Sequence, residues 1–188
     1  IQQSNSNSRR PIMRKMFILA TIPIIASCAP VQTPNVVAVS EVALANLVRA
    51  DGSSAGVATL SQRSDGLWMS ISADAPTAGS FGMHLHAVGK CDGPDFTTAG
   101  PHWNPSMKQH GRDNPMGSHA GDMPNMNAGA DRKLTIETQL VGVTLSGDGG
   151  LLDTDGAALV IHEKADDYKT DPSGNSGKRI ICGVFTKS

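Results

Sequence analysis

The chain has 188 residues, a formal net charge of −1 and few aromatic side chains, which make up 4% of the sequence. This length allows one domain of ordinary size plus a tail, and the near-neutral charge gives no support for nucleic-acid binding. Gly and Pro are plentiful, with 20 and 11 residues, as expected for short strands joined by turns or for long ordered loops.

Residues 1–28 have the layout of a secretory signal peptide, with a basic start, an apolar run over 17–26 and a small-residue exit. The apolar run is too short to span a bilayer comfortably, which disfavours a permanent transmembrane helix. The exit, IASC, resembles a bacterial lipobox, so we expect Cys28 to carry lipid and to begin the mature protein. The alternative is a plain signal peptide with a chance cysteine. Met13 or Met16 could be the true start, with an upstream extension before it.

Residues 29–40 are predicted to form a tether, and the folded domain is predicted to occupy 41–188. Four short segments rich in apolar or β-branched residues follow one another between 42 and 89, with Asp-Gly turn signals among them. Strand-like patterns return in KLTIETQLVGVTL, AALVIHE and RIICGVFTK. This pattern predicts an antiparallel sandwich or barrel.

Two histidines lie two residues apart in FGMHLH, at 81–86. Because side chains alternate along a strand, His84 and His86 are predicted to share one face, while Met83 and Leu85 point into a core. Paired imidazoles at this spacing could serve a metal of the copper type.

Residues 89–129 show little periodicity and hold three of the six histidines, with Asp122 three residues after His119. A loop this long inside a compact domain needs something to order it. Neutral imidazole is the commonest ligand for zinc and copper, and a loop that supplies two or three His and one Asp fits a closed tetrahedral zinc site. The spacing therefore predicts metal binding, but it does not identify the metals.

Six segments together resemble the successive signatures of copper,zinc superoxide dismutases. They include all six histidines, and they are GMHLHAVGKC, AGPHWNP, KQHG, SHAGDMPN, VIHEKADD and GNSGKRIICGV. The resemblance covers the chain from about Glu41 to its end. It implies an all-β fold, namely an eight-stranded antiparallel Greek-key barrel or sandwich with two long loops. The first is the metal-binding loop, and the second is the active-site loop at 163–178.

The resemblance also implies a set of site residues. The copper ligands would be His84, His86, His102 and His162, and the zinc ligands would be His102, His110, His119 and Asp122. His102 would thus bridge the two metals.

Four further residues match the family outside the ligand set. Asp166 matches the carboxylate that hydrogen-bonds a copper-ligand and a zinc-ligand histidine, although the neighbouring Asp167 is told apart from it only by the resemblance. Arg179 matches the arginine that attracts and orients the anion. Cys91 and Cys182 match the family's disulfide, which an exported chain permits.

The implied activity is dismutation of superoxide to dioxygen and hydrogen peroxide by a Cu(II)/Cu(I) cycle, with the zinc-supported His102 as bridge. The alternative is an exported copper-binding or copper-delivery protein with the same fold. Such proteins typically lack a copper ligand or the arginine, whereas this chain keeps all of them. We expect superoxide as substrate, copper and zinc as cofactors, and no nucleic-acid partner.

Several points stay open at the level of sequence. Lys178 or Lys169 could assist Arg179 in attracting the anion. Four methionines of the metal-binding loop could collect copper or simply fill space, and these are Met107, Met116, Met123 and Met126. The chain could be a monomer or a homodimer. We expect a periplasmic lipoprotein that contacts the membrane only through Cys28, with the outer membrane favoured because Ala29 follows that cysteine.

Overall fold

The computed structural model describes residues 38–188, so the predicted signal peptide at 1–28 and most of the predicted tether lie outside the described residues. Strand β1 (Val39–Arg49) begins before Glu41, the predicted domain boundary. Val39 pairs with Arg63, the last residue of β2 (Ser54–Arg63), so the sheet includes residues that precede Glu41. No helix within residues 38–188 is long and apolar enough to cross a membrane.

Strands dominate the described part of the chain. Asp-Gly turns connect the first three strands, and Gly52 adopts a φ of 79°, which glycine reaches at little cost. The other elements are β3 (Gly66–Asp74), β4 (Gly79–Phe81), β5 (Met83–His86), the short 3-10 helix η1 (Thr97–Ala99), β6 (Met126–Ala128), β7 (Lys133–Leu140), β8 (Ala158–His162), β9 (Arg179–Val184) and β10 (Thr186–Lys187).

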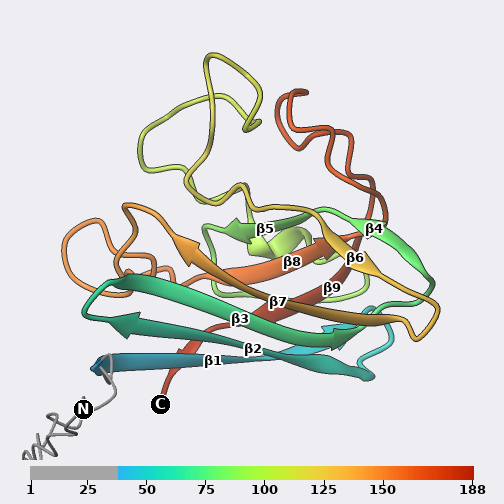
Figure 1. The fold of residues 1–188 in the computed structure, drawn as a ribbon, viewed down its shortest axis with the longest axis horizontal. Coiled ribbons are helices and arrows are strands. Elements are labelled where there is room, and N and C mark those ends of the chain that lie inside the picture. The colour runs from blue at the N-terminus through green and yellow to red at the C-terminus, as the bar shows by residue number, and fades with distance from the viewer. Residues whose placement is uncertain (1–37) are drawn as a thin grey trace, which may run out of the picture. The chain divides into compact units, whose positions relative to one another are not determined.

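All strand pairs are antiparallel, and the main sheet has the order β5-β8-β9-β1-β2-β3-β7 (Figure 1). Strand β10 pairs with β1. A second, two-stranded sheet pairs β4 with β6. Only Gly82 separates β4 from β5, and only Phe185 separates β9 from β10. Counting each interrupted pair once gives eight strands. The predicted all-β fold with a curled antiparallel sheet is confirmed.

Strand β7 ends earlier than its sequence pattern predicts. The segment KLTIETQLVGVTL suggests a strand that continues to Leu145, but β7 stops at Leu140. Gly142 has a φ of 74°, and Val141 beside it is exposed. The chain therefore turns at Gly142, and Leu145 returns to the core from a loop.

Strands β5 and β8 separate the core from the histidines. In their register Leu85 lies opposite Leu159, and both are buried in the main hydrophobic core, as is Met83. The alternate residues of the same strands, among them His84 and Val160, belong to the other face. The predicted division of FGMHLH into core and histidine faces is confirmed.

Two long loops cover the histidine face. Residues 87–125 connect β5 to β6, and residues 163–178 connect β8 to β9. Both loops lie on the same side of the strands in Figure 1, and backbone hydrogen bonds join them, for example from Asp113 N–H to the Tyr168 carbonyl at 2.9 Å. The fold thus places loop histidines over strand histidines.

Candidate metal centre

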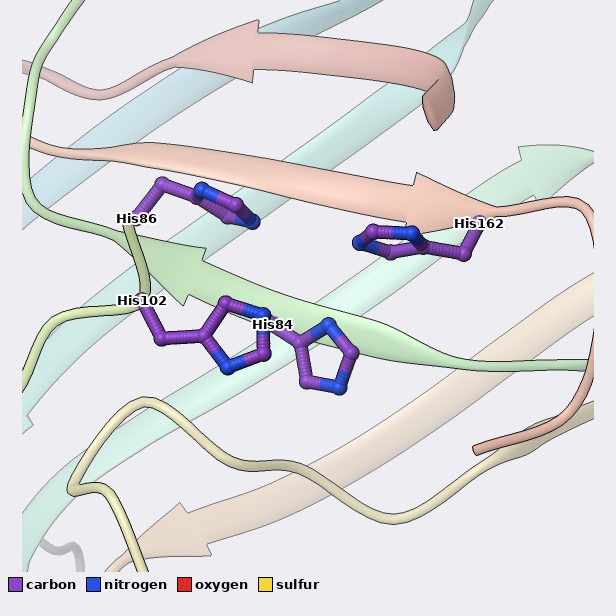
Figure 2. Close-up of side chains that lie close together, drawn as sticks. All are labelled: His84, His86, His102 and His162. Carbon is purple, nitrogen blue, oxygen red and sulfur yellow. The ribbon is translucent and has the colours of Figure 1, made fainter. Parts of the chain in front are cut away.

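All six histidines are buried and lie together. His84 and His86 come from β5, His162 ends β8, and the other three come from the loop at 87–125. One nitrogen from each of four rings lies within 4.8 Å of the others, in the group His84, His86, His102 and His162 (Figure 2). We call these residues the four-histidine group.

Three nitrogens in this group are buried and have no hydrogen-bond partner. They are Nδ1 of His84, Nε2 of His86 and Nε2 of His162. An unpaired buried polar atom costs on the order of 1–3 kcal/mol, so three at one point are rare unless they bind something. The lone pairs of neutral imidazoles are good ligands for copper. The four-histidine group therefore fits a metal ion.

The opposite nitrogen of each of these rings is held by a fixed acceptor. The partners are Asp166 Oδ2 for His84 at 2.7 Å, the Gly100 carbonyl for His86 at 2.8 Å and the Gly177 carbonyl for His162 at 3.1 Å. Such outer hydrogen bonds fix the orientation of a ligand histidine and its tautomer.

Burial keeps the four-histidine group neutral. It lowers the pKa of His86 to about 2 and that of His162 to about 3, with neighbouring histidines adding to the effect. Burial also lowers the pKa of His102 to about 4, although Asp122 opposes the shift. At neutral pH these rings are unprotonated and available as ligands.

A second group of donors surrounds Asp122. We call it the Asp122 group, and its members are His102, His110, His119 and Asp122. Its Oδ1 lies 3.0 Å from His102 Nδ1, 2.9 Å from His110 Nδ1 and 3.2 Å from His119 Nδ1. The Nδ1 atoms of His102 and His119 are 3.3 Å apart. Ligands about 2.0 Å from a tetrahedral zinc ion would be separated by roughly 3.3 Å. The predicted zinc ligands therefore lie together with a spacing that suits zinc.

A nitrogen of His84 also lies within 4.8 Å of donor atoms of His102, His110 and Asp122, so by distance alone His84 could be counted with that group instead of His119. We place it with the four-histidine group, because its Nε2 is bonded to Asp166 and its free Nδ1 belongs to that group. His102 has members of both groups around it. Its Nδ1 lies among the Asp122 donors, so Nε2 is the atom left to face the four-histidine group.

Hydrogen bonds fix the Asp122 carboxylate. Its Oδ2 accepts backbone N–H groups from Gly111 at 2.9 Å and His119 at 3.0 Å. Burial alone would raise the pKa of Asp122, but hydrogen bonds from His102, His110 and Gly111 outweigh it and hold the pKa well below its usual range. Burial likewise opposes protonation of His110, yet Asp122 and Asp166 raise the pKa of that ring to about 9.

Asp166 links the two groups. Its Oδ2 bonds His84 and its Oδ1 lies 3.0 Å from His110 Nε2. The carboxylate is buried, whereas Asp167 is exposed and only accepts hydrogen bonds within its own loop. Gly174 sits against Asp166 with a φ of 62°, and a Cβ there would overlap the carboxylate. This contact accounts for glycine in the GN turn.

Sequence reasoning missed the residues that hold Asp166 in place. The side chain of Asn125 donates to the Asp166 carbonyl at 2.9 Å and accepts the Asp166 N–H at 2.8 Å. The hydroxyl of Tyr168 in turn accepts the Asn125 N–H at 2.7 Å. No metal-ligand pattern includes an amide or a phenol, so the only usable signal was that Tyr168 is the single tyrosine of the chain.

Arg179 stands at the start of β9, next to the four-histidine group. Its guanidinium donates to the carbonyls of Phe96 at 2.8 Å and Gly100 at 2.9 Å. Together with His102 and His162 it lines a cavity of about 970 Å³. The Gly100 carbonyl accepts from both Arg179 and His86, so one atom helps to orient both side chains.

The disulfide between Cys91 and Cys182 is present, as predicted, with the two Cα atoms 5.7 Å apart. It joins the loop at 91–100 to β9, the strand that carries Arg179. The predicted assisting lysines do not line the cavity, whereas Lys108 does. Two of the loop methionines, Met123 and Met126, are buried in the core, and the other two, Met107 and Met116, are exposed.

Comparison with known proteins identifies the family. The sequence profile of copper/zinc superoxide dismutases matches residues 54–185. The chain belongs to the copper/zinc superoxide dismutase family. Enzymes of this family use copper and zinc, and the four-histidine group and the Asp122 group fit that pair of metals.

Several relatives are similar over most of their length. Superoxide dismutase [Cu-Zn] 1 of Aquifex aeolicus is 44% identical over 145 residues, which cover 74% of this chain and 85% of the relative. The superoxide dismutase [Cu-Zn] of Deinococcus radiodurans is 34% identical over 185 residues, covering 89% and 96%. The superoxide dismutase-like protein YojM of Bacillus subtilis is 46% identical over 143 residues, covering 74% and 73%.

Solved structures agree with this membership. The crystal structure of a SOD-like protein from Bacillus subtilis matches this chain with a TM-score of 0.73 and 42% identity, and the match covers 78% of this chain and 99% of that one. The Cu/Zn superoxide dismutase from Brucella abortus has a TM-score of 0.60 with 26% identity, covering 77% and 99%.

Proposed function

We propose that this protein catalyses the dismutation of superoxide, in which two superoxide anions and two protons give dioxygen and hydrogen peroxide. The observation that carries the proposal is the set of three unpartnered nitrogens in the four-histidine group, each on a ring whose other nitrogen is fixed. Family membership supports the same activity in general.

Each metal has a set of residues to hold it in this proposal. Copper would be held by His84, His86, His102 and His162, and zinc by His102, His110, His119 and Asp122. When bound, copper supplies one-electron chemistry, cycling between Cu(II) and Cu(I) as superoxide is first oxidised and then reduced. Asp166 keeps one histidine of each set in position.

His102 is the residue shared by both sets, and we propose that it transfers the proton that peroxide needs. Its Nδ1 faces the Asp122 group, so its Nε2 would take up a proton on the side of the cavity and give it to the departing peroxide. Arg179, which lines the same cavity, attracts the anion and orients it. Two backbone carbonyls hold the guanidinium, which keeps its charge directed at the site.

We further propose that the protein works in the periplasm, anchored to the outer membrane by lipid on Cys28. The basic start, the short apolar run and IASC support export and lipidation. These residues lie outside the described part of the chain. Superoxide crosses membranes poorly, so an exported enzyme would act on superoxide that arises outside the cytoplasm. A monomer and a homodimer are both compatible with this role.

The competing function is copper binding or delivery without turnover. The Bacillus subtilis relatives carry names that say only superoxide dismutase-like, so likeness of fold does not decide the question. This chain keeps four histidines around one point and Arg179 beside them. That complete set favours the enzyme.

Metal content and superoxide turnover measured on one sample test the proposal. The protein, loaded with both metals, is expected to contain one copper and one zinc per chain and to consume superoxide rapidly in a stopped-flow assay. Full loading with copper and zinc but no turnover would instead support the binding protein. Failure to bind copper at all would contradict both functions.

A further inference from the structure

The cavity beside Arg179 carries a second cation in its wall. Lys108, from the loop at 87–125, lines the cavity together with His102 and His162. Lys169 and Lys178 do not belong to the lining. Sequence reasoning singled out those two because they are near Arg179 along the chain, but the fold brings Lys108 to the same cavity from the opposite loop.

The backbone of Lys108 is held in place. The side chain of Asn104 accepts the Lys108 N–H at 3.1 Å and donates to the Lys108 carbonyl at 2.8 Å. Asn104 also lines the cavity. The lysine side chain is exposed, and these two bonds hold its backbone at the cavity wall.

The formal charge of the wall depends on Lys108. Arg179 and Lys108 contribute two positive charges, while Asp153 and Asp171 contribute two negative charges, so the wall is neutral when the histidines are neutral. Without Lys108 the wall would carry −1, and the whole chain already carries −1. An anionic substrate would then meet a cavity of its own sign.

No carboxylate neutralises this lysine within the described residues. Two other lysines, Lys133 and Lys187, form ion pairs with acidic side chains, but Lys108 forms none at 4.0 Å or less in residues 38–188. Asp171, in contrast, already has a hydrogen-bond donor, because its Oδ1 accepts the backbone N–H of His110 at 2.5 Å. The positive charge of Lys108 is thus available to an incoming anion.

We propose that Lys108 is the second attracting cation of the substrate cavity: it draws superoxide to the wall, and Arg179 then orients the anion at the metal centre. This assignment rests on the proposed dismutase activity. The hydrogen bonds of Lys108 within residues 38–188 are with Asn104 and not with a histidine of the metal centre, so we expect Lys108 to affect the rate at which the substrate arrives and to leave the chemistry at the metals unchanged.

Charge variants test the assignment. In the copper- and zinc-loaded protein, Lys108→Gln should lower kcat/KM about threefold at low ionic strength, since one charge several ångströms away in water contributes that factor. Lys108→Glu should lower it further, and Lys108→Arg should retain the wild-type value. The loss should disappear at about 1 M salt, where the Debye length is about 3 Å. Metal content should stay the same.

Lys169→Gln and Lys178→Gln are the matched controls, because each removes one positive charge from outside the cavity lining. Both are expected to keep kcat/KM close to that of the wild type. An equal loss in all three Gln variants would overturn the proposal, since only the net charge would then matter. A loss in Lys108→Gln that persists at high salt would overturn it too, because the effect would be structural.

Azide binding separates this proposal from the proposed activity. Azide is a small anion whose binding to the copper-loaded protein can be followed by visible absorption. Its Kd should rise about threefold in Lys108→Gln at low salt and stay unchanged in Lys169→Gln. If the wild type fails to consume superoxide but this difference in Kd appears, the proposed activity is wrong, and Lys108 is a cation that attracts small anions to the cavity without a role in superoxide turnover. An unchanged Kd in Lys108→Gln with normal wild-type turnover would reject Lys108 alone.

Discussion

Each strand histidine of the four-histidine group presents one nitrogen inward, and its other nitrogen is hydrogen-bonded to an acceptor. His84 is bonded to a carboxylate, while His86 and His162 are bonded to backbone carbonyls. The inward atoms are therefore fixed before any metal arrives. The two metals should respond separately to substitution, because apart from His102 the two sets use different side chains.

Asp122→Ala should remove zinc selectively. The carboxylate lies at the centre of the Asp122 group and touches none of the three unpartnered nitrogens. We expect zinc affinity to fall by at least 10- to 100-fold, thermal stability to fall and copper turnover to continue at a reduced rate. Metal analysis and thermal unfolding measure this, with Asp113→Ala as control, an exposed aspartate of the same loop. Loss of copper with zinc retained would contradict the assignment.

His162→Ala should have the opposite effect. Its ring belongs to the four-histidine group and makes no contact with Asp122. Zinc content should be preserved, whereas superoxide turnover should collapse, because three nitrogens no longer hold copper in a geometry suited to both oxidation states. Zinc content and turnover are measured on the same preparation. Full activity in this variant would show that copper uses other ligands.

Arg179→Ala should lower turnover roughly tenfold, since one cation at short range in a partly screened site contributes on the order of 1 kcal/mol. Copper and zinc content should not change, because the guanidinium bonds only the Phe96 and Gly100 carbonyls. The remaining activity should depend less on ionic strength. Turnover as a function of salt measures both effects, and an unchanged profile would exclude Arg179 from attracting the substrate.

The side chains that gather in the two donor groups could be named from sequence, because His and Asp carry their chemistry in the residue type. Their supporting acceptors were not, because a backbone carbonyl such as that of Gly100 or Gly177 has no signature in the sequence. Lys108 was missed for a related reason, since its place depends on how a loop without periodicity folds. The burial of Met123 and Met126 was equally a matter of tertiary packing.

At the scale of elements, the strands were easier to predict than their ends. Alternation of apolar and polar residues identified β1, β2 and β3, because one face of each contacts the core. The ends depend on single residues, as when Val39 finds a partner on β2 or Gly142 turns the chain after β7. The two loops have no such periodicity. The spacing of its histidines and Asp122 predicted metal binding by the first loop, whereas only the family resemblance predicted a role for the second.

The disulfide connects one of these loops to the sheet, and its removal should cost both stability and activity. Cys91 and Cys182 are 91 residues apart, and closing a loop of that length stabilises a fold by about 4–5 kcal/mol in the chain-entropy model. The double variant Cys91→Ser, Cys182→Ser should lose several kcal/mol of that, as measured by denaturant unfolding. Turnover should fall as well, because the loop at 91–100 supplies both acceptors of Arg179. Unfolding at the wild-type midpoint would contradict this.

At the scale of the whole molecule, acid should destabilise the metal-free protein. In the folded protein, burial lowers the pKa from the ordinary histidine value of 6.5 to about 2 for His86, about 3 for His162 and about 4 for His102. Below pH 6.5 these histidines bind protons in the unfolded chain but stay unprotonated in the folded protein. The free energy of unfolding therefore falls as the pH decreases towards the pKa values of the folded state. His110, with a pKa raised to about 9, opposes this trend but is outnumbered.

Denaturant unfolding of the metal-free protein at pH 7 and pH 5 measures the effect, and the free energy of unfolding should be smaller at pH 5. The metal-loaded protein should change less over this interval, because bound metal occupies the lone pairs that would take up protons. Equal or greater stability of the metal-free protein at pH 5 would mean that the histidines are not buried in the neutral form.

Anchoring is also a property of the whole molecule. If Cys28 carries lipid, Cys28→Ser should block processing or move the protein from the membrane to the soluble periplasmic or secreted fraction. Superoxide turnover of the folded domain should be preserved, since the ligand residues all lie beyond residue 83. Cell fractionation with detection of the protein measures this. A wild-type protein found entirely in the soluble fraction after export would exclude the anchor.

The Gly100 carbonyl accepts hydrogen bonds from His86 and from Arg179. When thermal motion displaces this atom, both donors are pulled in the same direction. We therefore expect their displacements to be correlated, so that the separation between the His86 ring and the guanidinium varies less than either position does. The spacing between these two side chains would then not require the whole loop to be rigid.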